Sequence, residues 1–186
     1  MKTHHAVFQL VAGALRVVAV ADTHSRPHPD LGRHIDALAP NRIVHTGDIG
    51  DPKVLRDLAR YAPVTAVRGN IDELGEPDVA IIDVREGERA LLRMLLTHIA
   101  VSGPRLRADI LRSAQREGAS LVVCGHSHVP FASHDRGVTV FNPGSAGPRR
   151  FHLPILFCWV DVAPGGVSVR HVDCETGETW RPNHGG

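Results

Sequence analysis

Apolar residues in the first third of the chain form short runs that alternate with polar segments. The run over residues 15–21 is rich in β-branched side chains and too short for a helix, which is typical of a buried strand. From residue 51 the apolar positions recur at helical spacing instead, after Asp51-Pro52, a good N-cap followed by a good first helical residue. The same criteria predict strands at 15–21, 42–46 and 64–67 and helices at 30–39 and from 51. This alternation predicts an α/β fold with parallel strands and right-handed crossovers.

The rest of the chain is richer in predicted strands. We expect a hairpin at 79–84 and 91–96, a helix at 106–117 that stops at Gly118, and strands at 121–124, 138–141, 155–162 and 167–172. The expected result is a mixed sheet, or two stacked sheets with flanking helices. Because 186 residues suffice for one domain of ordinary size, residues 1–186 are predicted to be a single domain, with 1–14 as an N-terminal extension or extra strand.

Charge and cysteine content exclude several classes of protein. The 21 Lys and Arg residues against 20 Asp and Glu give a net charge of +1, without the basic excess of a dedicated nucleic-acid or membrane-surface binder. No apolar run approaches the roughly 20 residues that span a bilayer. The three cysteines form no C-x-x-C pair, so the expected location is a reducing cytoplasm.

Residue types that bind metals follow the predicted strands at the point where each strand ends. Asp22 and His24 follow the first strand, Asp48 the second, Asn70 the third, His98 the strand at 91–96, and His126 and His128 the strand at 121–124. Because the carboxyl ends of strands line the ligand crevice of an open α/β sheet, we expect these seven side chains to meet. Three oxygen donors and four imidazoles are too many for one ion, and they suit two ions about 3.5–4 Å apart with a carboxylate between them.

Each of these motifs also has an ordinary structural interpretation. Asp22-x-His24 can be a surface loop, and Gly47-Asp48 and Gly69-Asn70 are common in turns. The four-residue stretch 125–128, Gly-His-Ser-His, is more specific, although it too occurs in solvated loops. The ordered combination, with every piece at a predicted strand end, favours a dinuclear metal centre over these alternatives.

In this order the motifs resemble those of the calcineurin-like metallophosphoesterases, and most of all their small YfcE-type phosphodiesterase branch. The matching pieces are Asp22-Thr23-His24, Gly47-Asp48, Gly69-Asn70-Ile71-Asp72, Thr97-His98, Gly125-His126-Ser127-His128 and Asn142-Pro143-Gly144-Ser145. The resemblance implies a four-layer α/β/β/α sandwich of two mixed sheets flanked by helices. It also implies that Asn142 to Ser145 form a loop at the rim of the site without a metal ligand.

The resemblance further implies how the ligands are shared between two divalent ions. Asp22, His24 and His128 would hold one ion, Asn70, His98 and His126 the other, and Asp48 would bridge them. Manganese is the expected metal, with nickel, cobalt, iron or zinc also compatible with these ligands. Asp48, Asn70 and His98 are the expected catalytic residues in a reaction where a hydroxide bridging the ions attacks phosphorus in line.

Three further positions bear on the chemistry. Ile71 stands where larger relatives have the histidine thought to protonate the leaving group, so we expect slow turnover of alkyl esters and better turnover of activated aryl diesters. Asp72 is expected to orient a ligand histidine, the alternative being a solvated turn carboxylate. Arg149, with Arg150, is a candidate contact for substrate phosphate, the alternative being a solvated pair.

The expected function is that of a metal-dependent phosphodiesterase acting on a small phosphate ester, without a membrane or nucleic-acid partner. Small relatives often self-associate, so the resemblance is also compatible with a homo-oligomer. The main alternative is a non-catalytic scaffold that binds partner proteins, as in the retromer-subunit branch of the same family. That branch has lost ligand chemistry at some positions, whereas this chain keeps all seven residues. A nuclease would share the chemistry but needs a basic groove, which the net charge of +1 does not favour.

Overall fold

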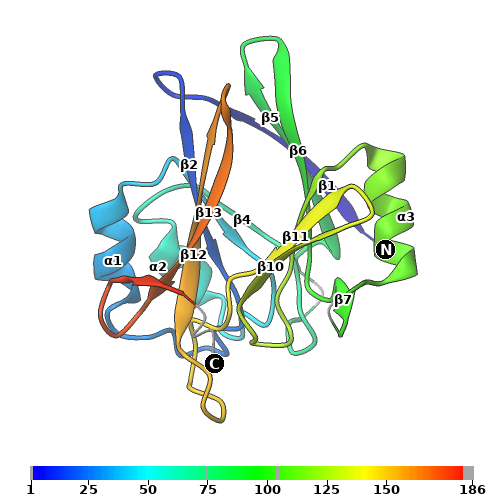
Figure 1. The fold of residues 1–186 in the computed structure, drawn as a ribbon. Coiled ribbons are helices and arrows are strands. Elements are labelled where there is room, and N and C mark those ends of the chain that lie inside the picture. The colour runs from blue at the N-terminus through cyan, green and yellow to red at the C-terminus, as the bar shows by residue number, and fades with distance from the viewer. Residues whose placement is uncertain (1, 74, 104, 182–186) are drawn as a thin grey trace.

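The computed structural model describes residues 2–73, 75–103 and 105–181. Two six-stranded mixed sheets dominate it (Figure 1). The first sheet has the order β1 (Thr3–Gln9), β5 (Val79–Glu86), β6 (Arg89–Thr97), β9 (Leu121–Val123), β11 (Val138–Asn142), β10 (Phe131–Asp135). The second has the order β14 (Thr179–Trp180), β13 (Gly166–Asp173), β12 (Leu156–Ala163), β2 (Leu15–Val20), β3 (Arg42–His45), β4 (Val64–Ala66). A short pair, β7 (Val101–Ser102) and β8 (Arg105–Leu106), lies beside them.

Three apolar clusters define four layers, as the resemblance of the motifs implies. In β2, Val17 and Ala19 pack between the two sheets, while Val18 and Val20 pack on the opposite face. The helices α1 (Leu31–Leu38) and α2 (Lys53–Leu58) cover that outer face, and α3 (Ala108–Glu117) covers the outer face of the first sheet (Figure 1). Because β2 is buried on both faces, its sequence is the nearly continuous apolar run from which it was predicted, with Arg16 as the one polar residue.

The predicted α/β order over residues 15–67 is confirmed. Strands β2, β3 and β4 are parallel neighbours, joined through α1 and α2 on the same face. In the first sheet β6 and β9 are also parallel and are joined through α3, which ends at Gly118 with φ of 68°. Parallel strands point their carboxyl ends in one direction, so the loops after β2, β3 and β4 open at the same edge.

Several boundaries differ from the prediction. The second helix begins at Lys53 with Pro52 as N-cap; Asp51 lies one position earlier and accepts the Lys53 N–H from outside the helix, over 2.7 Å. Helix α3 begins at Ala108, because the preceding residues pair with β7. The segment 1–14 contains an extra strand, β1, that runs parallel to β5 at the sheet edge. Strands β10 and β14 were not predicted, since they are short and lack an apolar run.

None of the helices within the described part of the chain is both long and apolar enough to cross a membrane.

Candidate metal centre

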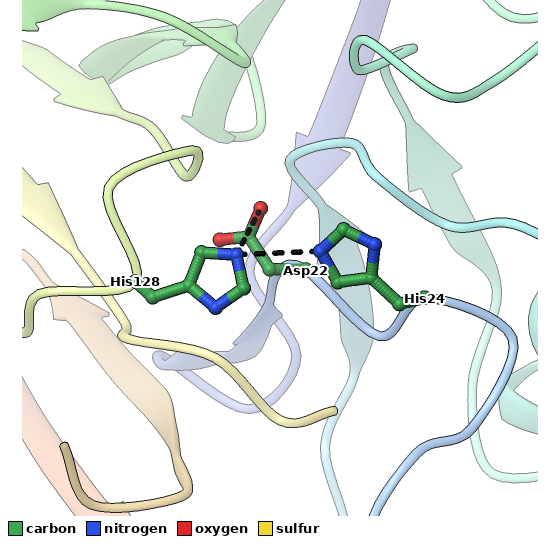
Figure 2. Close-up of side chains that lie close together, drawn as sticks. All are labelled: Asp22, His24 and His128. Carbon is green, nitrogen blue, oxygen red and sulfur yellow. Dashed lines mark hydrogen bonds and ion pairs between the residues drawn. The ribbon is translucent and has the colours of Figure 1, made fainter. Parts of the chain in front are cut away.

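Two histidines and one aspartate converge beyond the end of β2 (Figure 2). Asp22 and His24 follow β2, and His128 lies in the loop after β9. The Nε2 atoms of His24 and His128 are 3.3 Å apart, and His128 Nε2 is 3.7 Å from Asp22 Oδ1. One potential ligand atom from each residue lies within 4.8 Å of the others. Since imidazole nitrogen and carboxylate oxygen both bind divalent transition metals, this is a candidate metal-binding group.

A second group lies against the first and shares Asp22 with it. It consists of Asp22, Asp48 and His98, all three buried, with their potential ligand atoms again within 4.8 Å of one another. Asp48 follows β3 and His98 follows β6, so this group draws on both sheets. The ring of His126 meets the ring of His98 edge-on, with the centroids 5.2 Å apart.

Asn70, the last of the seven predicted residues, also lies at the centre. Its N–H donates a hydrogen bond to Asp48 Oδ1 over 2.6 Å, and it lines an open cavity of about 380 Å³ together with His98. The structure therefore brings together all seven residues predicted from the strand ends, namely Asp22, His24, Asp48, Asn70, His98, His126 and His128. Their roles as ligands are proposed below.

Asp48, a member of the second group, lies between His98 and His24. Its Oδ1 lies 3.3 Å from His98 Nε2, and its Oδ2 lies 3.7 Å from His24 Nε2. Burial opposes ionisation of this carboxyl, but the adjacent His98 imidazole and the N–H groups of Ile71 and Asn70 outweigh it and hold the pKa of Asp48 below its usual range. Asp48 is therefore an ionised carboxylate whose two oxygens face different sides of the centre.

Two buried polar atoms without hydrogen-bond partners indicate whether a cation fits the centre. Asp22 Oδ2 and His98 Nε2 are both buried and have no hydrogen-bond partner among the described residues. A buried polar atom left unpaired costs about 1–3 kcal/mol, and both atoms belong to the second candidate group. A divalent cation would satisfy both at once, so the residues fit a metal centre.

Protonation states also suit metal binding. His98 Nδ1 lies 2.8 Å from the backbone oxygen of Thr46, which only accepts, so Nδ1 carries a proton and Nε2 is the nitrogen that faces Asp48. Burial opposes a charge on His98, but the ionised Asp48 outweighs it and raises the pKa of His98, so a bound cation would replace the proton on Nε2. Burial is the largest cause of the lowered pKa values of His24 and His126, and it lowers the pKa of His128 to about 4. Three of the four imidazoles are therefore held neutral, the form that binds metals. Burial raises the pKa of Asp22 to about 7, against the lowering effect of His98.

The backbone at the centre is strained. Asp22, His24, Asp48, His126 and His128 all have positive φ, between 45° and 69°. The left-handed region costs a residue with a side chain roughly 1–2 kcal/mol, so the rest of the fold must hold these five residues in place. Such clustering of strained residues is typical of functional sites.

The structure corrects the expected role of Asp72. Its carboxylate was predicted to orient a ligand histidine, but its hydrogen bonds go to the backbone N–H groups of Ile49, Gly50 and Gly69, over 3.2, 2.8 and 2.7 Å. A turn carboxylate accepts most readily from nearby N–H groups that have no strand partner. Asp72 thus ties the loop after β3 to the loop after β4 and positions Asp48 through the backbone.

The structure separates the two adjacent arginines that were predicted as candidate phosphate contacts. Arg149, the predicted phosphate contact, is engaged elsewhere: its Nη2 lies 2.5 Å from Glu175 Oε2, and its Nη1 donates to the Leu153 carbonyl over 3.0 Å. It is Arg150 whose Nη2 lies 3.1 Å from His24 Nε2, beside the centre.

Two buried residues brace the centre without belonging to it. Asn142 Nδ2 donates to the carbonyl of Gly125 over 2.7 Å, which holds the loop that carries His126. Ser145 Oγ donates to the backbone oxygen of Asp22 over 2.9 Å. The sequence motif that contains them predicted a rim loop, but its contacts were not predictable because they join segments far apart in the chain.

His45, the last residue of β3, is buried next to the loops that carry Asp22 and Asp48. It is fully buried; its Nδ1 accepts the Gly47 N–H over 3.2 Å, so the proton is on Nε2, 3.1 Å from Thr23 Oγ1. Thr23 in turn donates to the carbonyl of Ile49 over 3.0 Å. This chain of hydrogen bonds links the loop after β2 to the loop after β3.

We expect His45 to make stability depend on pH. Burial lowers its pKa from 6.5 to about 4, so between these values the unfolded state binds a proton that the folded state does not. The contribution of neutral His45 to the unfolding free energy is complete above about pH 6.5. It falls as the pH drops toward 4, by about 2 kcal/mol between pH 7 and pH 4.5. Urea unfolding of the metal-free wild type and of His45→Gln at both pH values measures this effect. The difference between their unfolding free energies should be smaller at pH 4.5 than at pH 7 by that amount, and an equal difference at both pH values would contradict the prediction.

The chain belongs to the calcineurin-like phosphoesterase superfamily, because a model of that family's domain matches residues 15–165. A probable metallophosphoesterase of Methanocaldococcus jannaschii is 30% identical to it over 145 residues, which cover 76% of this chain and 73% of that protein. The family resemblance inferred from the motifs is thus confirmed.

Solved structures of two kinds share the fold. YfcE of E. coli, described as a phosphoesterase, superposes with a TM-score of 0.60 at 19% identity, covering 90% of this chain and 97% of that one. Vacuolar protein sorting 29 of Cryptosporidium parvum superposes with a TM-score of 0.71 at 18% identity, covering 90% of this chain and 95% of that one. At such identities the likeness establishes the metallophosphoesterase fold alone.

Proposed function

We propose that this protein is a dinuclear metal-dependent phosphoesterase that hydrolyses small phosphodiesters. The observation that carries the proposal is the placement of Asp48. Its carboxylate is ionised, and its two oxygens face His98 on one side and His24 on the other. A carboxylate so placed suits the bridging position between two cations.

The remaining ligands divide according to the two sides of Asp48. On one side Asp22, His24 and His128 form a compact candidate group. On the other side His98 contacts His126, and both would bind the second ion together with Asn70. The mixture of imidazole, carboxylate and amide ligands suits manganese, with iron, cobalt, nickel or zinc as alternatives. Two such ions lower the pKa of water toward neutrality and neutralise the charge that develops on phosphoryl oxygens.

The chain itself contributes position and shape to this reaction. Asp72 and the buried Asn142 hold the ligand-bearing loops, so the ligands are already arranged before substrate binds. A cavity of about 760 Å³ opens beside the centre, lined by Ser25, Ile49 and Ile71, each of which follows a proposed ligand in the sequence. It has room for the ester group of a small substrate.

Removal of metal tests the proposal directly. We expect protein purified with Mn²⁺ to bind two ions per chain and to hydrolyse bis(p-nitrophenyl) phosphate. EDTA should abolish the activity, and Mn²⁺, Co²⁺ or Ni²⁺ should restore it. A scaffold of this fold would instead show no metal-dependent hydrolysis of mono- or diesters, and that result would contradict the proposal.

We also expect the rate to depend steeply on the leaving group. The groups of titratable side chains that converge at the centre are made of proposed ligands, the guanidinium of Arg150 beside His24 is too weak an acid to serve, and the side chain of Ile71 has no proton to donate. A general acid commonly contributes about 10²–10⁴-fold, mostly for poor leaving groups. In a series of aryl and alkyl methyl phosphates, kcat should therefore fall as the leaving-group pKa rises; equal rates across the series would show that a proton donor is present.

A further inference from the structure

Arg150 lies beside the candidate centre, and among the described residues its positive charge has no carboxylate partner. Its Nη2 lies 3.1 Å from His24 Nε2, and its side chain is otherwise exposed.

A comparison with its neighbour shows that Arg150 is not simply a structural arginine. Arg149 is neutralised by Glu175 and also holds the Leu153 carbonyl, so its guanidinium is fully engaged in the loop. Within the described ranges Arg150 has no carboxylate partner, and its recorded side-chain contact is with His24. Arg150 therefore has N–H groups free to donate to an anion at the centre.

The contact between Arg150 and His24 cannot persist when the centre is loaded. A guanidinium only donates, so His24 Nε2 must accept from it. A cation bound through that nitrogen uses the same lone pair, which leaves the N–H groups of Arg150 without an acceptor and facing a positive ion. An anionic oxygen between the guanidinium and the ions would relieve both problems, because it accepts from one and coordinates the others.

We propose that Arg150 is a substrate-binding residue that hydrogen-bonds a non-bridging phosphoryl oxygen of the ester held at the metal centre. This inference rests on the proposed function and adds to it a third point of phosphate recognition beside the two ions. The planar guanidinium can donate two parallel hydrogen bonds, so it sets the orientation of the phosphoryl group as well as its affinity. The chemical class recognised is a phosphate group, and Arg150 contributes mainly to ground-state binding.

Calorimetric binding of orthophosphate to the Mn²⁺-loaded protein tests this assignment without relying on turnover. We expect Arg150→Ala to weaken orthophosphate binding about 10- to 100-fold, the effect of losing a charge-assisted hydrogen bond. Arg150→Lys should fall between the wild type and Arg150→Ala, since it keeps the charge and loses the fork. Arg149→Ala, which removes the same charge from the same loop, should change the affinity by less than about twofold. With bis(p-nitrophenyl) phosphate, Arg150→Ala should raise KM more than it lowers kcat.

The possible outcomes separate this inference from the proposed function. If the wild type binds two Mn²⁺ ions and orthophosphate, and Arg150→Ala binds orthophosphate equally well, the role of Arg150 is wrong and the metal centre stands. An equal loss in Arg149→Ala and Arg150→Ala would also overturn it, because the effect would then be one of net charge or loop stability. Tighter Mn²⁺ binding by Arg150→Ala with unchanged orthophosphate affinity would make Arg150 a competitor of the metal instead. A wild type that binds no Mn²⁺ would overturn both proposals.

Discussion

Replacement of Asp48 by asparagine should abolish phosphodiester hydrolysis while leaving the protein folded. The amide keeps the shape of the side chain and can still accept the N–H groups of Asn70 and Ile71 through one oxygen. It lacks the charge and the second oxygen that faces His24, so it cannot bridge two cations. We expect the Mn²⁺ content to fall from two ions per chain to one or none, and kcat/KM to fall at least about 10³-fold, since metal ions contribute several kcal/mol to such reactions.

The matched control is Asp36→Asn, which changes an exposed carboxylate on α1. It should retain two ions and full activity. Thermal unfolding of the metal-free proteins checks that both variants keep the fold. Activity within tenfold of the wild type in a folded Asp48→Asn protein would show that Asp48 is not the bridging residue.

The second large effect is expected from a single methyl group at Gly69. A Cβ at this position would collide with the backbone nitrogen and the Oδ1 of Asp48. These atoms cannot move aside, because Asp48 Oδ1 accepts from Asn70 and the Gly69 N–H is held by Asp72. Gly69→Ala should therefore displace Asp48, lower the unfolding free energy by about 1–3 kcal/mol, as in other overpacked sites, and lower kcat/KM at least about 10²-fold.

Gly165→Ala is the control for the general effect of exchanging glycine for alanine. Gly165 lies in the turn between β12 and β13, where an added Cβ meets no atom within 4 Å. Urea unfolding, Mn²⁺ content and hydrolysis of bis(p-nitrophenyl) phosphate should all match the wild type in this variant. If Gly69→Ala behaved in the same way, the close approach of the loops after β3 and β4 would not be needed for the centre.

Strong local patterns made most of the fold predictable. Strand β2 is a valine-rich, mostly apolar run because both of its faces are buried, and α3 has helical periodicity and a glycine stop. Strand β10 carries no such signal: it alternates between intermediate and exposed residues and exists because β11 pairs with it. Strand β14, two residues long, likewise depends on its partner β13.

The amino-acid sequence by itself determined the fold class, the family and the seven residues that meet at the candidate centre. The family followed from the resemblance of the ordered motifs, and the seven residues from their place after predicted strands, because parallel strands of one sheet bring their carboxyl ends together. That the carboxyl ends of two different sheets meet at this centre is shown by the tertiary structure. Asp22 and His128 are 106 residues apart, yet both were placed at the centre by the strands that precede them.

Only the tertiary structure decided which polar groups support that centre. Asp72 holds backbone N–H groups instead of a histidine, Arg150 faces the site while Arg149 binds Glu175, and Asn142 braces a distant loop. These contacts depend on side-chain direction and on loop geometry, including left-handed residues such as Asp48. Neither leaves a periodic pattern in the sequence, because each is set by the packing of segments that are remote along the chain.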